Sequence, residues 1–168
     1  MSDFFTKRDI DIFLFKAIFE NDIQKIRIYL DQKVDISDNN RSIYGETALT
    51  CAVKRGVIEI VNLLLENGAH INEKDIYGHS SLMVASNRNE TKIVPILLKY
   101  GANIYEETIY GFNSINIASN FNNLNIIDIF NKWSLTMLII VLQELYIYHM
   151  LDCSSYIDIY EYIGYEKI

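Results

Sequence analysis

The stretch "IYGETALTCAVKRGVIEIVNLLLENGAHIN", residues 43–72, decides the fold because the chain repeats it. Residues 76–105 read "IYGHSSLMVASNRNETKIVPILLKYGANIY", and residues 109–133 read "IYGFNSINIASNFNNLNIIDIFNKW". The Tyr-Gly pair returns with a spacing of 33 residues, at Tyr44, Tyr77 and Tyr110. A fixed period of this length is typical of proteins built from stacked repeats, in which each unit packs on its neighbours.

The residues that recur are those that a tight turn and two packed helices require. The glycine after each tyrosine can adopt the left-handed backbone of a turn without strain. A side-chain oxygen that can cap the first helix follows two residues later, at Thr47, Ser80 and Asn113. The small residues of the first helices are Ala52, Ala85 and Ala118. The second helices carry an apolar stripe, Ile60, Val61, Leu64 and Leu65, which is repeated as Ile93, Val94, Leu97 and Leu98.

A 33-residue period with a turn, a small-residue helix and a Leu-rich helix resembles the ankyrin repeat. The resemblance implies an all-α solenoid of about four helix-turn-helix units with β-turn fingers, closed by a C-terminal helical cap. We expect the repeats to occupy residues 1–132, with units at about 9–41, 42–74, 75–107 and 108–132, and the cap to occupy residues 133–168. The first unit lacks the Tyr-Gly turn but keeps both helices, with Asn21 standing where Gly56 stands in the second unit.

Three features of the sequence predict soft places in this array. The proline and histidine of the ankyrin motif are replaced in the first helices by Ala48-Leu49-Thr50, Ser81-Leu82-Met83 and Ser114-Ile115-Asn116. Pro95 falls near the fifth position of a second helix, where it lacks the N–H for an early intrahelical hydrogen bond. The fourth unit is rich in asparagine, a poor helix former. We therefore expect local weakening at Pro95 and earliest unfolding in the fourth unit.

The repeat pattern stops at Trp133. We expect one apolar helix over Leu135–Leu151 and a short helix over Tyr156–Ile163, which together cover the last repeat, since the open end of a solenoid needs a cover. The alternative is a membrane segment, but the unbroken apolar run is shorter than the roughly 18 residues that a span requires, and Gln143-Glu144 interrupts it. The tail resembles the Trp-initiated, Tyr-rich tails of some ankyrin proteins of large DNA viruses, and the Ile- and Asn-rich composition is what AT-rich codons produce.

The composition argues against several classes of function. The net charge is −7 and Lys and Arg are scattered, so we expect no nucleic-acid partner. The two cysteines, Cys51 and Cys153, form no Cys-x-x-Cys motif, and the N-terminus lacks the apolar run of a signal peptide, which predicts a cytoplasmic protein, in the host cytoplasm if it is viral. No phosphate-binding, metalloprotease or hydrolase motif occurs, and no second metal ligand stands near any of the three histidines. We therefore expect no enzyme activity, no catalytic residue, no metal and no cofactor.

Ankyrin arrays bind other proteins on the concave face formed by the turn tips and the ends of the first helices, and the resemblance implies the same surface here. The residues at these positions are Ile43, Tyr44, Glu46, Lys54, Arg55, Ile76, Tyr77, His79, Asn87, Arg88, Ile109, Tyr110, Phe112, Asn120 and Phe121. Two roles are open for the recurring tyrosines, contact with the partner or packing on the next turn. The residue after each turn glycine differs between units and is the better candidate for specificity. By the same resemblance, Asn72 stands where an asparaginyl hydroxylase modifies ankyrin repeats.

The sequence thus predicts a non-enzymatic protein–protein interaction module. The alternative is a membrane-associated effector whose C-terminal apolar helix docks on a membrane or on a partner. The sequence names neither the partner nor the oligomeric state.

Overall fold

The computed structural model describes residues 7–32, 36, 42 and 44–147, and it describes side chains only between 12 and 143. This part of the chain contains eight α-helices and no strand: α1 Lys7–Glu20, α2 Ile23–Asp31, α3 Ala48–Arg55, α4 Ile58–Glu66, α5 Ser81–Asn87, α6 Ile93–Lys99, α7 Ser114–Asn120 and α8 Leu124–Ile147. The chain divides into two units, Met1–Phe130 and Asn131–Ile168, so that α8 belongs to both. Each unit is described by itself.

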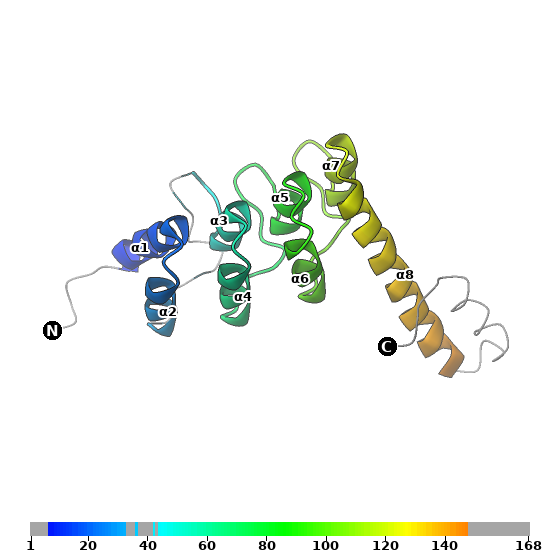
Figure 1. Cartoon of the computed structure of the whole chain (residues 1–168), viewed down its shortest axis with the longest axis horizontal. Helices are drawn as coiled ribbons and strands as arrows, with labels where there is room; N and C mark the ends of the chain where they lie inside the picture. The colour runs from blue at the N-terminus through cyan, green and yellow to red at the C-terminus, as the bar shows by residue number, and fades with distance from the viewer. Residues whose placement is uncertain (1–6, 33–35, 37–41, 43, 148–168) are drawn as a thin grey trace. The chain divides into compact units, whose positions relative to one another are not determined.

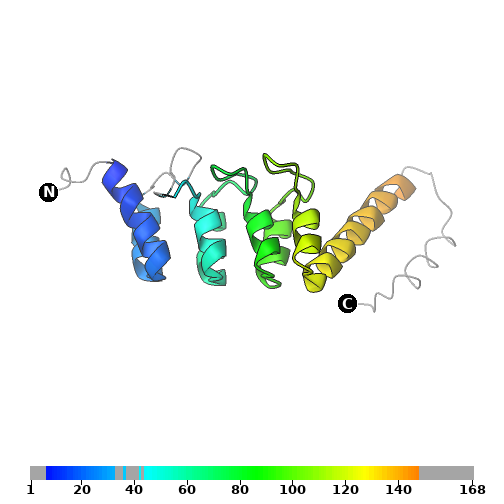
Figure 2. The ribbon, with the colours of Figure 1, turned by 90° about the horizontal axis from the view of Figure 1, so that it is seen from above.

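The first unit is a stack of helix pairs. Helices α1, α3, α5 and α7 follow one another in one layer, and α2, α4 and α6 follow one another in a second layer (Figure 1). Each helix of a pair packs on its partner, as α3 does on α4, and on the corresponding helix of the next pair. The loop from α4 to α5 and the loop from α6 to α7 project on the same side of the helices (Figure 2). The predicted all-α solenoid of helix-turn-helix units is confirmed.

The turns and helix ends have the backbone that the sequence predicts. Gly45, Gly78 and Gly111 have φ values of 74°, 79° and 77°, which is the left-handed region. A second left-handed position lies between the two helices of each pair, at Asn21, Gly56, Asn89 and Asn122. Asparagine is the residue that most readily replaces glycine there. The predicted equivalence of Asn21 and Gly56 is therefore confirmed, and the same junction recurs in all four pairs.

The core of the first unit consists of the predicted small and aliphatic positions. Ala52, Ala85 and Ala118 are fully buried, which lets neighbouring first helices approach closely. The stripes of the second helices are buried as well, from Ile60 to Leu65 on α4 and from Ile93 to Leu98 on α6, with only their outward-facing members left in solvent. The helices are short, so most of their stability comes from this packing rather than from helix propensity.

In the three units that carry the Tyr-Gly turn, the residue that replaces the family histidine takes part in a hydrogen bond at the start of the first helix. The Thr50 hydroxyl donates to the Thr47 carbonyl at 3.0 Å. In the next unit the Ser80 N–H donates to the Met83 sulfur at 3.4 Å, a weaker bond because thioether sulfur is a poor acceptor. In the fourth unit the Asn113 N–H donates to the Asn116 side-chain oxygen at 3.2 Å. The starts of α3, α5 and α7 are therefore capped.

Pro95 lies closer to the start of its helix than the fifth position predicted, and local weakening there stays a prediction. Helix α6 begins at Ile93, so Pro95 is its third residue and lies in the first turn. The N–H groups of a first turn have no intrahelical partner, and proline at such a position removes nothing. Helix α6 is shorter at its start than α4. The first residue of α4 is Ile58, and a spacing of 33 residues would start α6 two residues before Ile93, where it begins.

Several asparagines of the fourth unit lie at helix ends, where asparagine is favourable rather than disruptive. The Asn113 side chain caps α7 by accepting from the Asn116 N–H at 2.9 Å. The Asn123 amide donates to the Ser86 carbonyl at 2.6 Å and to the Asn87 carbonyl at 3.1 Å. These two bonds join the start of α8 to the end of α5. The argument that asparagine disturbs the helices of this unit does not apply to these positions. Earliest unfolding of the fourth unit stays a prediction.

Two buried hydroxyls mark the places where the family proline is missing. Ser81 and Ser114 are the first residues of α5 and α7, both are buried, and neither hydroxyl has a hydrogen-bond partner within the described residues. The corresponding first residue of α3 is Ala48.

We expect Ser81→Ala and Ser114→Ala each to raise the free energy of unfolding by about 1 kcal/mol, because burying an unpaired hydroxyl is costly. Urea unfolding followed by circular dichroism measures this, with Ser86→Ala as the control. The Ser86 hydroxyl donates to the Leu82 carbonyl at 2.7 Å, so its loss should not stabilise the protein.

The tail differs from the prediction in where its helix begins. Helix α8 runs without a break from Leu124 to Ile147, so no separate helix starts near Leu135. The second helix of the fourth pair and the apolar tail segment are one element, because the sequence between them contains neither glycine nor proline. The predicted helix at Tyr156–Ile163 lies outside the described residues.

Candidate partner-binding groove

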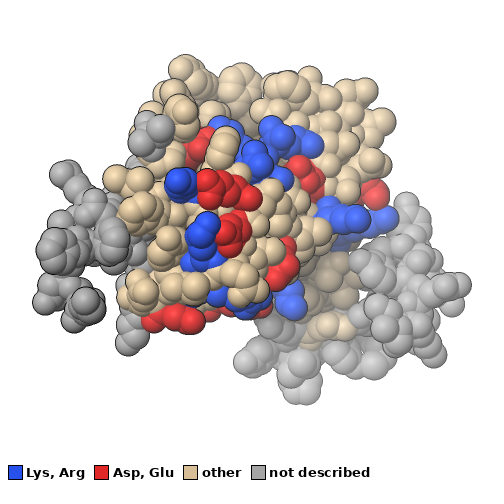
Figure 3. All heavy atoms as spheres, turned by 60° about the vertical axis from the view of Figure 1, so that its left-hand side comes forward, with Lys and Arg blue, Asp and Glu red and all other residues tan. Residues whose placement is uncertain are grey.

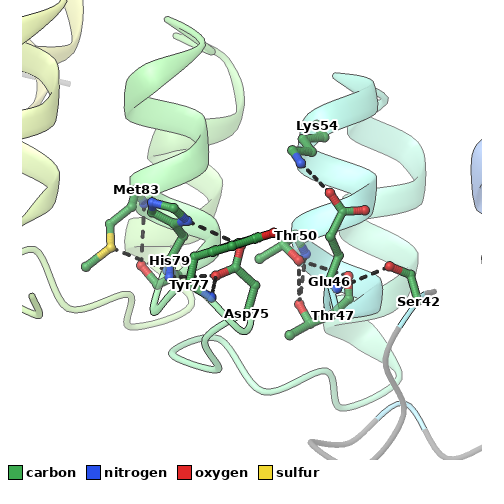
Figure 4. A network of polar contacts seen from close by, with 10 residues as sticks. Ser42, Glu46, Thr47, Thr50, Lys54, Asp75, Tyr77, His79 and Met83 are labelled. Carbon is green, nitrogen blue, oxygen red and sulfur yellow. Dashed lines mark hydrogen bonds and ion pairs between the residues drawn. The ribbon is translucent and has the colours of Figure 1, made fainter. Parts of the chain in front are cut away.

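Each finger is held by the same small network, which the sequence analysis did not find. The Asp75 carboxylate accepts from the Tyr77 N–H at 2.9 Å and from the His79 N–H at 2.8 Å (Figure 4). Ser42 and Thr108 make the same two bonds through their hydroxyls, to the residues that correspond to Tyr77 and His79. The signal was present, since these three residues are also 33 apart and all carry a side-chain oxygen. The backbone adds a bond from the turn glycine to the same residue in each finger.

The isoleucine before each tyrosine joins successive fingers. The Ile76 N–H donates to the Gly45 carbonyl at 3.2 Å, and the Ile76 side chain covers Gly45 so closely that a Cβ there would lie 2.6 Å from it. Ile109 covers Gly78 in the same way, with its backbone nitrogen 3.0 Å from a Cβ at that position. Neither isoleucine lines the groove described below, although both were predicted as partner-binding residues. Ile43, the remaining predicted residue of this kind, lies outside the described residues.

The recurring tyrosines are more than half exposed. The exposed fractions of Tyr44, Tyr77 and Tyr110 are 68%, 53% and 71%. The Tyr77 ring is within 6.2 Å of the His79 ring, measured between centroids, and lies tilted to it at 46°. Ile76 and Ile109, which contact the preceding turn glycines, are exposed to a similar extent, at 59% and 69%, so the role of the tyrosines stays a prediction.

The fingers and the first helices line two adjoining hollows of the first unit. The larger, of about 880 Å³, lies between α1, α3 and the first two fingers; the smaller, of about 470 Å³, lies between α3, α5, α7 and the last two fingers. Lys54, Asp75, Tyr77 and Arg88 border both hollows, which therefore form one groove. Predicted site residues that line this groove are Tyr44, Glu46, Lys54, Arg55, Tyr77, His79, Asn87, Arg88, Tyr110, Phe112, Asn120 and Phe121.

The groove also contains residues that the sequence analysis missed. Helix α1 contributes Ile12, Phe15, Lys16 and Phe19. Phe19 holds the Arg55 guanidinium over its ring, with 4.8 Å between the guanidinium carbon and the ring centroid. These α1 residues were missed because the first unit lacks the Tyr-Gly turn on which the repeats were aligned.

The two carboxylates of the groove are occupied within the protein. Glu46 forms an ion pair with Lys54, and its side chain is only 12% exposed (Figure 4). Asp75 holds its turn and lies 3.3 Å from His79 Nδ1, and its side chain is only 6% exposed. Figure 3 shows acidic and basic side chains interspersed on the face seen from the α1 side. Among the described residues that do not line the groove, Lys25 pairs with Asp22 at 2.7 Å and Arg27 pairs with Glu59 at 3.2 Å.

Cys51 borders the larger hollow but is not suited to nucleophilic chemistry. Burial raises the pKa of the Cys51 thiol to about 11, from an ordinary value of 9.0, and the nearby Glu46 carboxylate adds to the rise. The reactive form of cysteine is the thiolate, and this shift lowers its fraction at neutral pH by about a hundredfold. The thiol of the folded protein is therefore protonated at physiological pH.

We expect Cys51 to react slowly with iodoacetamide at pH 8 in the folded protein, at least about a hundredfold more slowly than in urea, because both burial and protonation disappear on unfolding. Mass spectrometry of the Cys51 peptide measures this reaction separately from that of Cys153. The rate should rise through pH 9 and 10, since the thiolate forms only as the pH nears the raised pKa. Equal rates with and without urea at pH 8 would contradict the assignment.

The sequence analysis also considered metal ligands and the modification of Asn72. No group of three potential ligands among His, Cys, Asp and Glu lies together in the described part of the chain. Asn72 bridges two successive loops: its amide donates to the Gly101 carbonyl at 3.3 Å, and its oxygen accepts from the Asn103 N–H at 2.9 Å. Asn72 thus has a structural role, and its hydroxylation stays a prediction.

The stacked helix pairs and the groove along their fingers define a helical repeat protein of the solenoid class, which presents one extended surface built from successive units. The model of the ankyrin repeats, in three copies, matches residues 14–108, and the chain belongs to the ankyrin repeat family. Ankyrin repeats are generally protein–protein interaction modules and are typically not enzymes. No curated protein matches the chain.

Proposed function

We propose that the protein is a non-enzymatic interaction module of the cytoplasm that binds a partner protein in the groove. The observation that carries this proposal is the row of exposed tyrosines, Tyr44, Tyr77 and Tyr110, along two hollows that share their border residues. Tyrosine and arginine are enriched at protein interfaces because each covers a large area and also forms hydrogen bonds. Both residue types line this groove.

The finger networks support the proposal energetically. Binding costs free energy whenever loops must be ordered, and a surface that is already held in its bound shape avoids this cost. Each finger is fixed by two bonds to the side chain of Ser42, Asp75 or Thr108, and Ile76 and Ile109 join it to its neighbours. The tyrosines therefore project from a prearranged backbone.

The test compares two pairs of tyrosines that differ only in location. The groove variant is Tyr77→Ala with Tyr110→Ala, and the control is Tyr100→Ala with Tyr105→Ala, whose residues are also exposed but do not line the groove. Quantitative affinity capture from cytosol should recover a set of proteins with the wild type and the control. The groove variant should lose these proteins by about tenfold or more, since aromatic residues at the centre of an interface are each worth about 2 kcal/mol or more.

Equal recovery with both variants would contradict the groove assignment. The unfolding midpoint of both variants in urea should stay close to that of the wild type, because exposed side chains contribute little to folding. This measurement separates a loss of binding from a loss of structure.

A second candidate function, membrane association, is favoured by the length of α8. The segment Leu124–Gln143 is 20 residues long with a mean hydropathy of 1.4, which is long and apolar enough to cross a membrane by length and composition. This segment is not an unbroken apolar run, because Asp128 and Lys132 lie within it. Ile126 and Phe130, however, are buried in the first unit, so a span over this segment would remove them from a folded core.

Flotation with liposomes distinguishes the two functions. The interaction module should remain in the dense fraction. Co-flotation that disappears in Leu138→Glu, which alters an exposed apolar residue of α8, would favour membrane association. Flotation that is unchanged in this variant would be assigned to another part of the chain.

A further inference from the structure

The exposed charges of the groove are all positive, although the chain as a whole is acidic. The net charge of the chain is −7. The cationic side chains of the groove are Lys16, Lys54, Arg55 and Arg88, and all four residues are exposed. The two carboxylates that line it, Glu46 and Asp75, are nearly buried and already have partners. The exposed charge of the groove is therefore opposite in sign to the net charge of the protein.

The arginines are the cations that remain available to a ligand. Lys54 pairs with Glu46, and Lys16 lies 3.9 Å from Glu20. No ion pair joins Arg55 or Arg88 to any described residue, and the contact of Arg55 is the cation–π contact with Phe19. A planar guanidinium recognises carboxylates through two parallel hydrogen bonds, so Arg55 and Arg88 are suited to acidic side chains.

The same groove offers an apolar surface beside the arginines. Phe19 and Tyr44 are exposed at the larger hollow, and Phe15 is half-buried there. A hollow of about 880 Å³ can accept a large side chain of a ligand. The aromatic side chains of the groove suit an apolar group at the centre of a ligand, and the two available guanidinium groups suit negative charges on either side of it.

We infer that the groove binds an acidic peptide segment of another protein, in which an aromatic or large aliphatic residue is flanked by Asp or Glu. The inference rests on the proposed function and names the chemistry of the partner. The apolar residue enters between Phe19, Tyr44 and Tyr77, and the flanking carboxylates bind Arg55 and Arg88. Phosphate polymers fit less well, because two carboxylates lie among the four cations and no basic stripe continues beyond the groove.

The test is selection of a random peptide display library on the full-length protein. We expect the selected peptides to be negatively charged and to contain an aromatic or large aliphatic residue. In binding assays with labelled synthetic copies, Arg55→Gln with Arg88→Gln should weaken binding by about 10–100-fold, because each replacement removes the charge that pairs with a carboxylate. Phe19→Ala should relax the preference for the apolar residue while the preference for acidic residues persists.

The matched control is Arg27→Gln. Arg27 is a half-exposed arginine of α2 that pairs with Glu59 and does not line the groove, so its replacement should leave peptide binding unchanged. The reversal Arg55→Glu with Arg88→Glu should shift the selection toward basic peptides. A shift of this kind cannot arise from partial unfolding.

The possible outcomes separate this inference from the proposed function. Selection of neutral or basic peptides that are lost with Tyr77→Ala and Tyr110→Ala would overturn the inference and keep the groove as a protein-binding site. Absence of any peptide that depends on the groove would overturn both. Binding of labelled oligothymidine or of phosphatidylserine vesicles that disappears in the arginine variants would assign the groove to phosphate and also overturn the inference.

Discussion

Replacing Phe130 with alanine should lower the free energy of unfolding by about 3–5 kcal/mol, the usual cost of deleting a buried phenylalanine. Phe130 is 2% exposed and lies at the end of the first unit, in the part of α8 that completes the fourth helix pair. In a stack where each pair contacts only its neighbours, the pair at the end has support on one side only. Such a loss would remove a large share of the stability expected of a domain of this size.

The effect of Phe130→Ala should also be local. Hydrogen exchange should accelerate first in α7 and the start of α8, while α3 and α4 stay protected until the whole protein unfolds. The control is Phe121→Ala, which alters a phenylalanine at the end of α7 that is 58% exposed. Its expected effect on stability is within about 0.5 kcal/mol. Similar destabilisation by both variants would show that Phe130 does not hold the fourth pair in place.

Replacing Gly78 with alanine should lower the free energy of unfolding by about 2–3 kcal/mol, through backbone strain and a close contact together. Gly78 has φ of 79°, and a Cβ at this position would lie 3.0 Å from the backbone nitrogen of Ile109. Because the contact is to backbone, the next finger must shift to accommodate the methyl group. Urea unfolding measures the change.

Gly111→Ala separates the two contributions. Gly111 has nearly the same φ, 77°, but no described atom lies within 4 Å of a Cβ there. We expect about 1–2 kcal/mol, from backbone strain alone. If the two alanine variants were equally stable, the contact between successive fingers would carry no energetic weight, and Ile109 would not join them as described.

The sequence by itself determined the repeat and most of the local structural features within each unit. A spacing of 33 residues located the turns, the caps and the buried alanines, because each of these depends on the residue type at one position. Gly45 and Thr47 could be assigned in this way, since a left-handed turn and an N-cap are local properties. The apolar stripe of α4 followed from helical periodicity, which is also a local pattern.

The tertiary structure decided which of the repeated positions contact a neighbouring unit. Tyr77 and Ile76 are adjacent, recur equally well and are exposed to a similar extent, yet Ile76 also covers the preceding glycine and Tyr77 lines the groove. The contribution of Phe19 to the groove depends on how α1 packs beside α3, and that packing places its ring under Arg55. Contacts between units depend on distance in space, and a pattern read along one chain gives only the residue types that are available for them.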